Sequence, residues 1–262
     1  MSYTIITGAT GGLGKAISIE CAQKGYNLIL TGRSSEKLLD LFDCLTKIRP
    51  NIDIRFFPCD LSSVDDRSGL FNSLIKNNLS IERVIHVAGV DTQMALKNYT
   101  HEKLIFQSRV NLEAVFDLTL FALKNKVDRL EVLTISSICA AVPIGYFSVY
   151  SSTKAALKHF FDSLRLEYKN KEVTFTTVLP GSITTRADII ADIEKQGLQG
   201  RLSKKTPEYV AKKALKALER RRKNYVPGFY NKIVYFFSKV TPRSISSKIT
   251  TRKFSHKEKD SF

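Results

Sequence analysis

Six short apolar segments alternate with helix-length segments along most of this 262-residue chain. They are rich in Ile, Leu and Val, and we expect them to be strands: residues 3–6, 27–31, 54–57, 83–87, 130–135 and 173–179. Apolar strands that are separated by helices form parallel βαβ units, in which helices cover both faces of the sheet. The alternation therefore predicts an α/β fold with a doubly wound, Rossmann-like parallel sheet.

The length of the chain is sufficient for one large domain with a buried core. We expect this domain to span residues 1–222, with residues 182–206 forming either a substrate lid or an ordinary surface segment. Residues 223–262 would form a helical C-terminal extension. Strand-like sequence begins at Tyr3 and no long uncharged apolar run follows, so we predict a cytoplasmic protein without a membrane-spanning helix.

The four cysteines are isolated from one another and from histidines. Cys21, Cys44, Cys59 and Cys139 form no C-x-x-C pair and have no histidine at metal-ligand spacing. We therefore expect four reduced core thiols, with neither a disulfide framework nor a metal site.

A glycine-rich turn follows the first predicted strand and opens a predicted helix. Without a Cβ, backbone N–H groups can approach a diphosphate, and the helix N-terminus adds a favourable dipole. An ordinary turn is the alternative for an isolated glycine loop, but the order of strand, turn and helix predicts a nucleotide site. Its expected binding residues are Gly8, Thr10, Gly11, Gly12, Leu13 and Gly14.

The residues after the second predicted strand indicate which dinucleotide would bind. An acidic residue at this place hydrogen-bonds the ribose of NAD, whereas an arginine pairs with the 2′-phosphate of NADP. The chain has Arg33 here, followed by Ser34, whose hydroxyl can bind the same phosphate. The alternative is a solvated surface arginine. We predict NADP as the cofactor.

A tyrosine and a lysine are placed for proton transfer. Tyr150 and Lys154 are four residues apart, so in a helix their side chains are neighbours. An ammonium beside a phenol stabilises the phenolate and lowers its pKa from about 10, which suits an acid/base. Ser137 ends another strand and could donate a hydrogen bond to a substrate oxygen. The alternative for the tyrosine and lysine alone is an exposed helical pair.

These motifs resemble those of the short-chain dehydrogenase/reductase family, whose marks are a T-G-x-x-x-G-x-G turn, a serine and a Y-x-x-x-K pair. The resemblance covers about residues 1–190. It implies a catalytic set of Asn111, Ser137, Tyr150 and Lys154, in which Asn111 holds a water of the proton relay. Lys154 would also bind the nicotinamide ribose. The implied activity is interconversion of a carbonyl and a secondary alcohol with NADP(H).

The resemblance also implies cofactor contacts after three further strands. These residues are Asp60 and Leu61 near the adenine, Ala88 and Gly89 along the cofactor, and Pro180, Gly181, Ile183 and Thr185 at the nicotinamide. Asp60 or Ser62 could alternatively cap the helix beginning near Val64. The chain departs from the family's N-N-A-G segment, because His86-Val87 precedes Ala88-Gly89. We expect His86 to be a structural hydrogen-bonding residue.

The net charge of +16 is concentrated at the C-terminus, because residues 201–262 contain 18 Lys/Arg and four Asp/Glu, a net +14. Tyr230, Ile233, Val234 and Phe237 recur at helical spacing, with Lys232 and Lys239 among them. This pattern predicts a basic amphipathic helix. It could lie on an anionic membrane surface, or its apolar face could pack on the domain or line the substrate pocket.

The resulting functional prediction is an NADP-dependent oxidoreductase acting on a small molecule. The segments Pro227-Gly228 and Pro242-Arg243-Ser244 resemble those of lipid- and steroid-directed members, which favours a hydrophobic lipid, acyl or steroid-like substrate. A catalytically silent redox sensor or scaffold is the alternative. The family also implies a homodimer or homotetramer through helices around Asn111 and Tyr150. No stacking or base-reading module is evident, so we expect no nucleic-acid partner.

Overall fold

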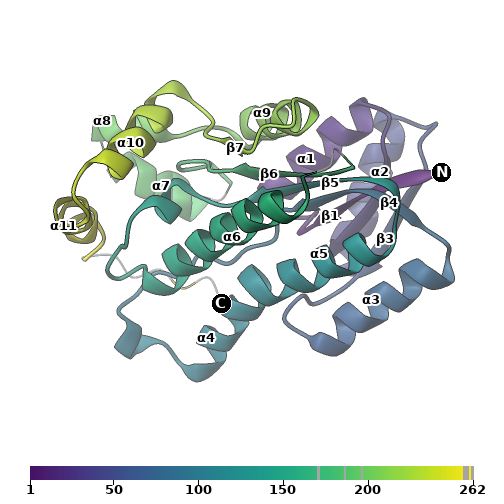
Figure 1. Ribbon diagram of the computed structural model, residues 1–262, viewed down its shortest axis with the longest axis horizontal. Helices are drawn as coiled ribbons and strands as arrows, with labels where there is room; N and C mark the ends of the chain where they lie inside the picture. Colours follow the sequence, from purple (N-terminus) through teal and green to yellow (C-terminus); the bar gives the residue numbers. More distant parts are fainter. Residues whose placement is uncertain (170–171, 186, 196, 256–259, 261–262) are drawn as a thin grey trace.

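The computed structural model describes residues 1–169, 172–185, 187–195, 197–255 and 260. Its described part contains one seven-stranded sheet, in the order β3-β2-β1-β4-β5-β6-β7 with parallel pairing throughout (Figure 1). The strands are β1 (Ser2–Thr7), β2 (Asn27–Gly32), β3 (Ile54–Pro58), β4 (Ser80–His86), β5 (Lys126–Ile135), β6 (Val173–Val178) and β7 (Asn224–Tyr225). The predicted doubly wound α/β fold is confirmed.

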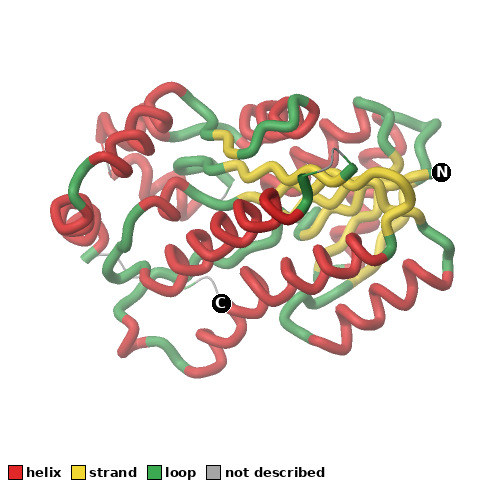
Figure 2. Tube along the Cα trace, in the orientation of Figure 1, coloured by secondary structure: helices red, strands yellow, loops and turns green. Residues whose placement is uncertain are grey.

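Helices cover both faces of the sheet (Figure 2). The helices are α1 (Gly12–Gln23), α2 (Ser35–Ile48), α3 (Val64–Lys76), α4 (His101–Ser108), α5 (Ala114–Lys124), α6 (Ser148–Glu167), α7 (Ala187–Lys195), α8 (Gly197–Ser203), α9 (Pro207–Glu219), α10 (Phe229–Val240) and α11 (Arg243–Phe254). One core cluster joins α1, α2 and α9 to the sheet, and another joins α3, α5 and α6 to its opposite face. These two cores hold the strand ends in place.

Alternation of side chains along the strands explains the two cores. Successive residues of a strand point to opposite faces, so a strand that is apolar at every position can bury both. Ile5 packs in the cluster with α3, α5 and α6, whereas the next residue, Ile6, packs in the cluster with α1, α2 and α9. Leu28 and Ile29 divide in the same way on β2, and all four side chains are fully buried.

Several helices begin where a hydroxyl caps the first turn. Ser34 Oγ accepts from the Lys37 N–H at 3.2 Å and starts α2. The predicted caps Asp60 and Ser62 are wrong for α3, because Ser63 Oγ accepts from the Asp66 N–H at 3.1 Å. Asp60 instead accepts from both the N–H and the hydroxyl of Ser62 in the turn before the helix. The side chain of Asp60 therefore shapes the loop after β3.

The region after β6 contains more structure than the apolar pattern indicates. Residues 182–206, predicted as a lid or surface segment, include α7 and α8, and Ile183 forms a parallel bridge with Lys205. Residues 186 and 196 of this segment lie outside the described residues. The two-residue strand β7 follows residue 222 and pairs with β6. The sheet is therefore completed by residues of the predicted C-terminal extension.

The predicted apolar stripe of α10 is split between two faces. Tyr230 and Val234 are half-buried, whereas Ile233 and Phe237 are exposed. The inner face instead centres on Asn231 and Tyr235, because Asn231 makes hydrogen bonds inside the domain and Tyr235 packs with Leu179 and Val226. The inner side of this helix therefore packs on the domain, which was one of the expected alternatives. Residues 256–259, 261 and 262 of the extension lie outside the described residues.

The cysteines occupy two kinds of environment. Cys21 and Cys59 are buried, and burial raises the pKa of Cys59 to about 11. Cys44 and Cys139 are only half-buried, so the expectation of four core thiols is wrong for them. Within the described residues all four are free thiols, and no group of three or more His, Cys, Asp or Glu is arranged to hold a metal ion. None of the helices in this part of the chain combines the length and apolarity needed to cross a membrane.

Candidate active site

The predicted site residues gather at one edge of the sheet. Parallel strands end together, and in such sheets ligands bind beyond the carboxyl ends where strand order reverses. The reversal here lies between β1 and β4, which are neighbours in the sheet. Gly8 follows β1 directly, and Ala88 and Gly89 come two and three residues after the end of β4. A Cβ on Gly8 would lie 2.9 Å from the Ala88 Cα, so the two loops are in close contact.

The glycine turn forms a tight backbone cradle. Gly8 has a φ of +63°, a conformation that favours glycine. A Cβ on Gly14 would lie 2.0 Å from the Gly8 carbonyl oxygen, and Leu13 is buried beneath the turn. The N-cap of α1 is Gly11, which has no side chain to cap the helix. The cradle and the uncapped helix start fit a diphosphate, which backbone N–H groups would hold.

Two other loops reach this turn. A Cβ on Gly12 would lie 3.0 Å from the Thr185 Cβ, which places the loop after β6 against the start of α1. A Cβ on Gly32 would lie 3.1 Å from Thr10 Oγ1, which places the end of β2 beside the turn. The Pro180 carbonyl accepts from the Ile138 N–H at 3.0 Å, so the loop after β6 also contacts the segment that follows Ser137. The structure therefore brings the predicted diphosphate and nicotinamide residues together.

The predicted adenosine end lies along β2 and β3. Arg33 is exposed, and its guanidinium carbon lies 5.8 Å from the ring centroid of Phe106. The Ser34 hydroxyl caps α2 by accepting a hydrogen bond from the Lys37 N–H. Leu61 is buried, and its carbonyl accepts from Arg67 Nη1 at 2.7 Å. The exposed Arg33 presents a positive charge at the end of β2, next to the start of α2.

Ser137, Tyr150 and Lys154 form the centre of the site. Ser137 follows β5, whereas Tyr150 and Lys154 lie in the first two turns of α6. The Lys154 ammonium donates to the Ile135 carbonyl at 3.0 Å and lies 5.6 Å from the Tyr150 ring centroid. The Tyr150 ring stacks on Phe147 with their centroids 4.4 Å apart. The hydrogen bond from Lys154 thereby holds the start of α6 against the end of β5.

Asn111 lies in a π-helical turn, Arg109–Glu113, between α4 and α5. Such widened turns are frequent at functional sites. The Asn111 amide accepts from the Val90 N–H at 2.8 Å and donates to the Val90 carbonyl at 2.9 Å and to Thr153 Oγ1 at 3.1 Å. Asn111 therefore links the loop after β4 to helix α6.

Electrostatics at the centre differ from the expectation in one respect. Although part of the Tyr150 side chain is exposed, desolvation raises its pKa, and the charges of Cys139 and Asp91 add to this, while the Ser137 hydroxyl opposes it. Burial also lowers the pKa of Lys154 to about 8. Desolvation is the largest cause, and the Lys154 ammonium donates to a backbone carbonyl. Tyr150 is thus a neutral phenol at neutral pH.

Sequence reasoning missed three residues near the site. Asp91 lies close enough to act on the pKa of both Tyr150 and Lys154, and its signal was a carboxylate two residues after Gly89. Thr153 binds Asn111. Asn231 of α10 lies against the nicotinamide turn, since a Cβ on Gly181 would meet Asn231 Oδ1 at 2.7 Å. Nothing local marks Asn231, because its contacts come from distant segments.

His86 lies inside the domain, away from solvent. Its Nε2 is 3.0 Å from Thr119 Oγ1, and burial lowers its pKa to about 3. The expected structural role agrees with this burial. A folded-state pKa below the ordinary 6.5 means that the unfolded chain takes up this proton first as the pH falls.

We expect His86→Asn to flatten the acid side of the stability profile. The stability that neutral His86 supplies is complete above about pH 6.5 and is lost towards pH 3, by up to about 1.4 kcal/mol per pH unit. Urea unfolding of wild type and variant between these limits measures the difference in slope. The exposed His159→Asn is the control. Parallel profiles for wild type and His86→Asn would contradict the assignment.

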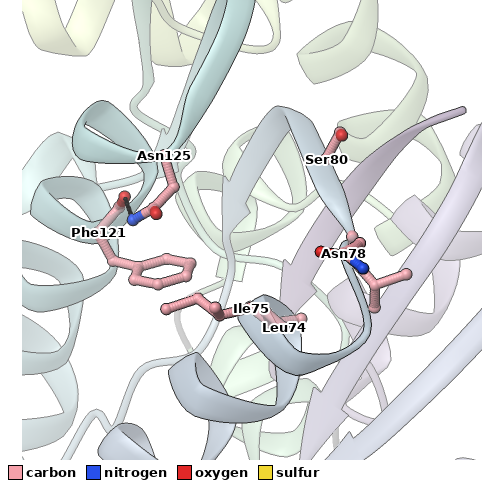
Figure 3. Close-up of a pocket in the computed structure, with 7 residues that line it drawn as sticks. Leu74, Ile75, Asn78, Ser80, Phe121 and Asn125 are labelled. Carbon is pink, nitrogen blue, oxygen red and sulfur yellow. Dashed lines mark hydrogen bonds between the residues drawn. The ribbon is translucent and has the colours of Figure 1, made fainter.

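A separate cavity lies at the opposite edge of the sheet. It has a volume of about 250 Å³ and lies between the end of α3, the start of β4 and the end of α5 (Figure 3). Its lining residues are Leu74, Ile75, Asn78, Leu79, Ser80, Phe121 and Asn125. This lining contains no charged side chain and no base that could activate the Ser80 hydroxyl, so the strand carboxyl ends remain the candidate site.

A parallel sheet with a glycine cradle at its switch point, and with a serine, a tyrosine and a lysine at the same edge, is the arrangement of a nicotinamide-dependent dehydrogenase. Comparison with known proteins agrees. The short chain dehydrogenase family model matches residues 2–195. The chain belongs to the short-chain dehydrogenase family, whose members are oxidoreductases.

Individual relatives resemble most of the chain. The mouse very-long-chain 3-oxoacyl-CoA reductase is 30% identical over 240 residues, which cover 86% of this chain and 71% of the relative. The solved structure of a 7beta-hydroxysteroid dehydrogenase has a TM-score of 0.82 at 20% identity, covering 95% of this chain and 96% of that one. A Burkholderia cenocepacia short chain dehydrogenase in complex with NADP has a TM-score of 0.76 at 19% identity, covering 87% and 96%. The chain spans 59% to 81% of the lengths of the first curated relatives that it matches.

Proposed function

We propose that the chain is an NADP(H)-dependent oxidoreductase that interconverts a carbonyl and a secondary alcohol. The observation that carries the proposal is the meeting of Ser137, Tyr150, Lys154 and Asn111 beside the glycine cradle at one edge of the sheet. A nicotinamide cofactor would supply the hydride to the carbonyl carbon. The cradle would hold its diphosphate, and the Pro180-Gly181 turn its nicotinamide.

The protein's own part in the reaction is to bind the carbonyl oxygen and supply its proton. Ser137 donates a hydrogen bond to this oxygen, on which negative charge develops. Tyr150, kept neutral by desolvation, gives its hydroxyl proton to the same oxygen and becomes a phenolate. The Lys154 ammonium stabilises that phenolate until solvent restores the proton. Because Tyr150 is protonated, it carries the proton that carbonyl reduction requires.

The preference for NADP is supported by Arg33. Its exposed guanidinium follows β2, where an acidic residue would select the unphosphorylated ribose. The match to a short chain dehydrogenase in complex with NADP agrees with this assignment. Contacts from Thr10, Gly11, Gly12, Leu61 and Ile183 are proposed to complete the cofactor site.

A hydrophobic substrate is supported by the surroundings of Ser137. Ile138, Ala140 and Ala141 follow it and pack against a cluster of Leu179, Val226 and Tyr235. Relatives and neighbours include proteins named for very-long-chain 3-oxoacyl-CoA and for 7beta-hydroxysteroids. We therefore propose a lipid, acyl or steroid-like carbonyl compound.

Spectrophotometry of NADPH oxidation tests the proposed reaction. A panel of steroid ketones, 3-oxoacyl thioesters and small ketones is incubated with the protein and with NADPH or NADH. We expect turnover with at least one hydrophobic ketone and with NADPH in preference. Tight NADPH binding without any turnover would instead support the alternative, a nucleotide sensor or scaffold.

The outer sides of α5 and α6 support a homodimer or homotetramer. They enclose a groove of about 340 Å³ with an apolar floor of Phe116, Leu120, Leu123, Phe160 and Leu164, and Leu120 is half exposed. Burial of such a groove by a second copy would remove apolar surface from water. Light scattering of the purified protein is expected to give a mass of two or four chains. A cytoplasmic location is proposed from the free thiols.

A further inference from the structure

Helix α10 is held firmly on its inner side. The Asn231 amide donates to the Ser203 and Pro227 carbonyls at 3.0 Å each and accepts from the Ser203 hydroxyl at 3.0 Å. Tyr235 packs with Leu179 and Val226. These contacts fix the rotation of the helix, so its remaining side chains have a defined outward direction.

The outward side chains of α10 and α11 are largely apolar. Phe229 is 80% exposed, and Phe236, Phe237 and Val240 are each about 60% exposed. On the next helix, α11, Ile245 and Ile249 are 51% and 67% exposed. We call this set, with the less exposed Ile233, the outer surface of α10 and α11. Apolar residues gathered in this way on two consecutive helices mark an interaction surface.

Basic residues accompany this apolar surface. Lys232 and Lys239 on α10 and Arg243, Lys248 and Arg252 on α11 are all exposed. The sequence from residue 220 to residue 257 contains eleven Lys/Arg and no Asp or Glu. The surface therefore combines aromatic and aliphatic side chains with positive charge. The apolar side chains are complementary to the acyl chains of a bilayer, and the positive charges to its anionic headgroups.

We propose that the outer surface of α10 and α11 docks on an anionic phospholipid bilayer. A second copy of the chain fits it less well, because pairing this face with itself would bring the two sets of cations together. A nucleic acid would match the charge and could stack on the phenylalanine rings, but it would leave the aliphatic Val240, Ile245 and Ile249 without an apolar partner. A bilayer satisfies both the charge and the aliphatic groups.

The surface lies at the same end of the molecule as the candidate active site. The chain begins at one end of the long axis, and the parallel strands run from there towards α10 and α11 (Figure 1). Thr251 Oγ1 of α11 accepts from the Gly145 N–H at 3.0 Å, in the segment between Ser137 and Tyr150. If the proposed function holds, a lipid substrate would pass from the bilayer to the site over a short path.

Co-sedimentation of the full chain with vesicles tests the apolar contribution. We expect binding to equal mixtures of phosphatidylglycerol and phosphatidylcholine, and much weaker binding to phosphatidylcholine alone. Phe236→Ser/Phe237→Ser should lower the affinity for anionic vesicles by at least about 10-fold, because two rings no longer insert. The matched control, Leu39→Ser/Ile48→Ser, removes exposed apolar groups from α2 and should bind as wild type.

A second pair of variants tests the charge. Lys239→Gln/Arg243→Gln should weaken binding about 30-fold at low salt, since each cation near an anionic surface contributes roughly fivefold. Lys47→Gln/Lys76→Gln removes the same charge from α2 and α3 and should have less effect. Salt at about 0.5 M should release wild type and reduce the difference. Thermal unfolding and light scattering of every variant verify an unchanged fold and mass.

The proposal is overturned by equal binding to both kinds of vesicle, by no binding, or by equal losses in control and test variants. A mass that falls by half in Phe236→Ser/Phe237→Ser would show an interface between copies instead. Tight binding of a labelled DNA single strand, lost in the same variants, would show a nucleic-acid surface. Sedimentation requires no turnover, so failure of the proposed reaction leaves this test valid.

Discussion

Tyr150→Phe is expected to lower turnover by about 100-fold or more while leaving NADPH binding nearly unchanged. The substitution keeps the ring that stacks on Phe147 and removes only the hydroxyl. Proton donation by a positioned side chain contributes about 10² to 10⁴ in rate, and no other phenol stands in its place beside Ser137 and Lys154 among the described residues. Steady-state rates with a substrate found by the NADPH screen, together with fluorescence titration of NADPH, measure both quantities.

Tyr146→Phe is the matched control for this variant. Tyr146 is exposed and lies four residues before Tyr150, so loss of its hydroxyl should not alter turnover. Lys154→Ala should impair both cofactor binding and turnover, because its ammonium lies between the Ile135 carbonyl and the Tyr150 ring. Near-normal turnover by Tyr150→Phe would refute the proposed proton donor.

Arg33→Ala is expected to weaken NADPH binding by roughly 10- to 100-fold and to leave NADH binding nearly unchanged. A charge-assisted contact to a phosphate contributes about 1.5 to 3 kcal/mol, and only NADPH carries the 2′-phosphate. Titration of both cofactors against wild type and variant measures the change in preference. A fall in the ratio of NADPH affinity to NADH affinity in the variant would identify Arg33 as the residue that determines cofactor preference.

Arg49→Ala controls for the general loss of positive charge near α2. Arg49 follows the last residue of that helix, whereas Arg33 precedes its first turn. We expect both cofactors to bind Arg49→Ala as they bind wild type. A wild-type protein that prefers NADH would contradict the assignment of NADP without reference to any variant.

Much of the fold was predictable because its signals are local and repeated. Each of the six long strands contains an apolar run, and the predicted C-terminal end of each lies within one residue of the observed one, whereas β4 and β5 begin three and four residues earlier than predicted. Parallel strands bring such ends together, so Gly8, Ser137 and Pro180 could be assigned to one edge from the sequence. Strand β7 was missed because two residues are too few to form a pattern.

Other features depend on tertiary contacts that no local pattern contains. The rotation of α10 follows from the hydrogen bonds of Asn231 to Ser203 and Pro227. The raised pKa of Tyr150 follows from desolvation at the junction of β5 and α6, and helical spacing alone had indicated the opposite direction. The influence of Asp91 on Tyr150 likewise arises from distance in space.

The contact between Gly145 and Thr251 limits how the C-terminal segment can be exchanged. A Cβ on Gly145 would lie 2.6 Å from the Thr251 Cγ2, so any larger residue at 145 needs a compensating change on α11. Gly228, at the start of α10, is constrained for another reason, because its φ of +90° is a backbone conformation that favours glycine. A chimera that grafts the tail of a relative onto this domain would therefore have to carry matching residues on both sides of the junction. The C-terminal segment and the loop before α6 therefore have to be exchanged together.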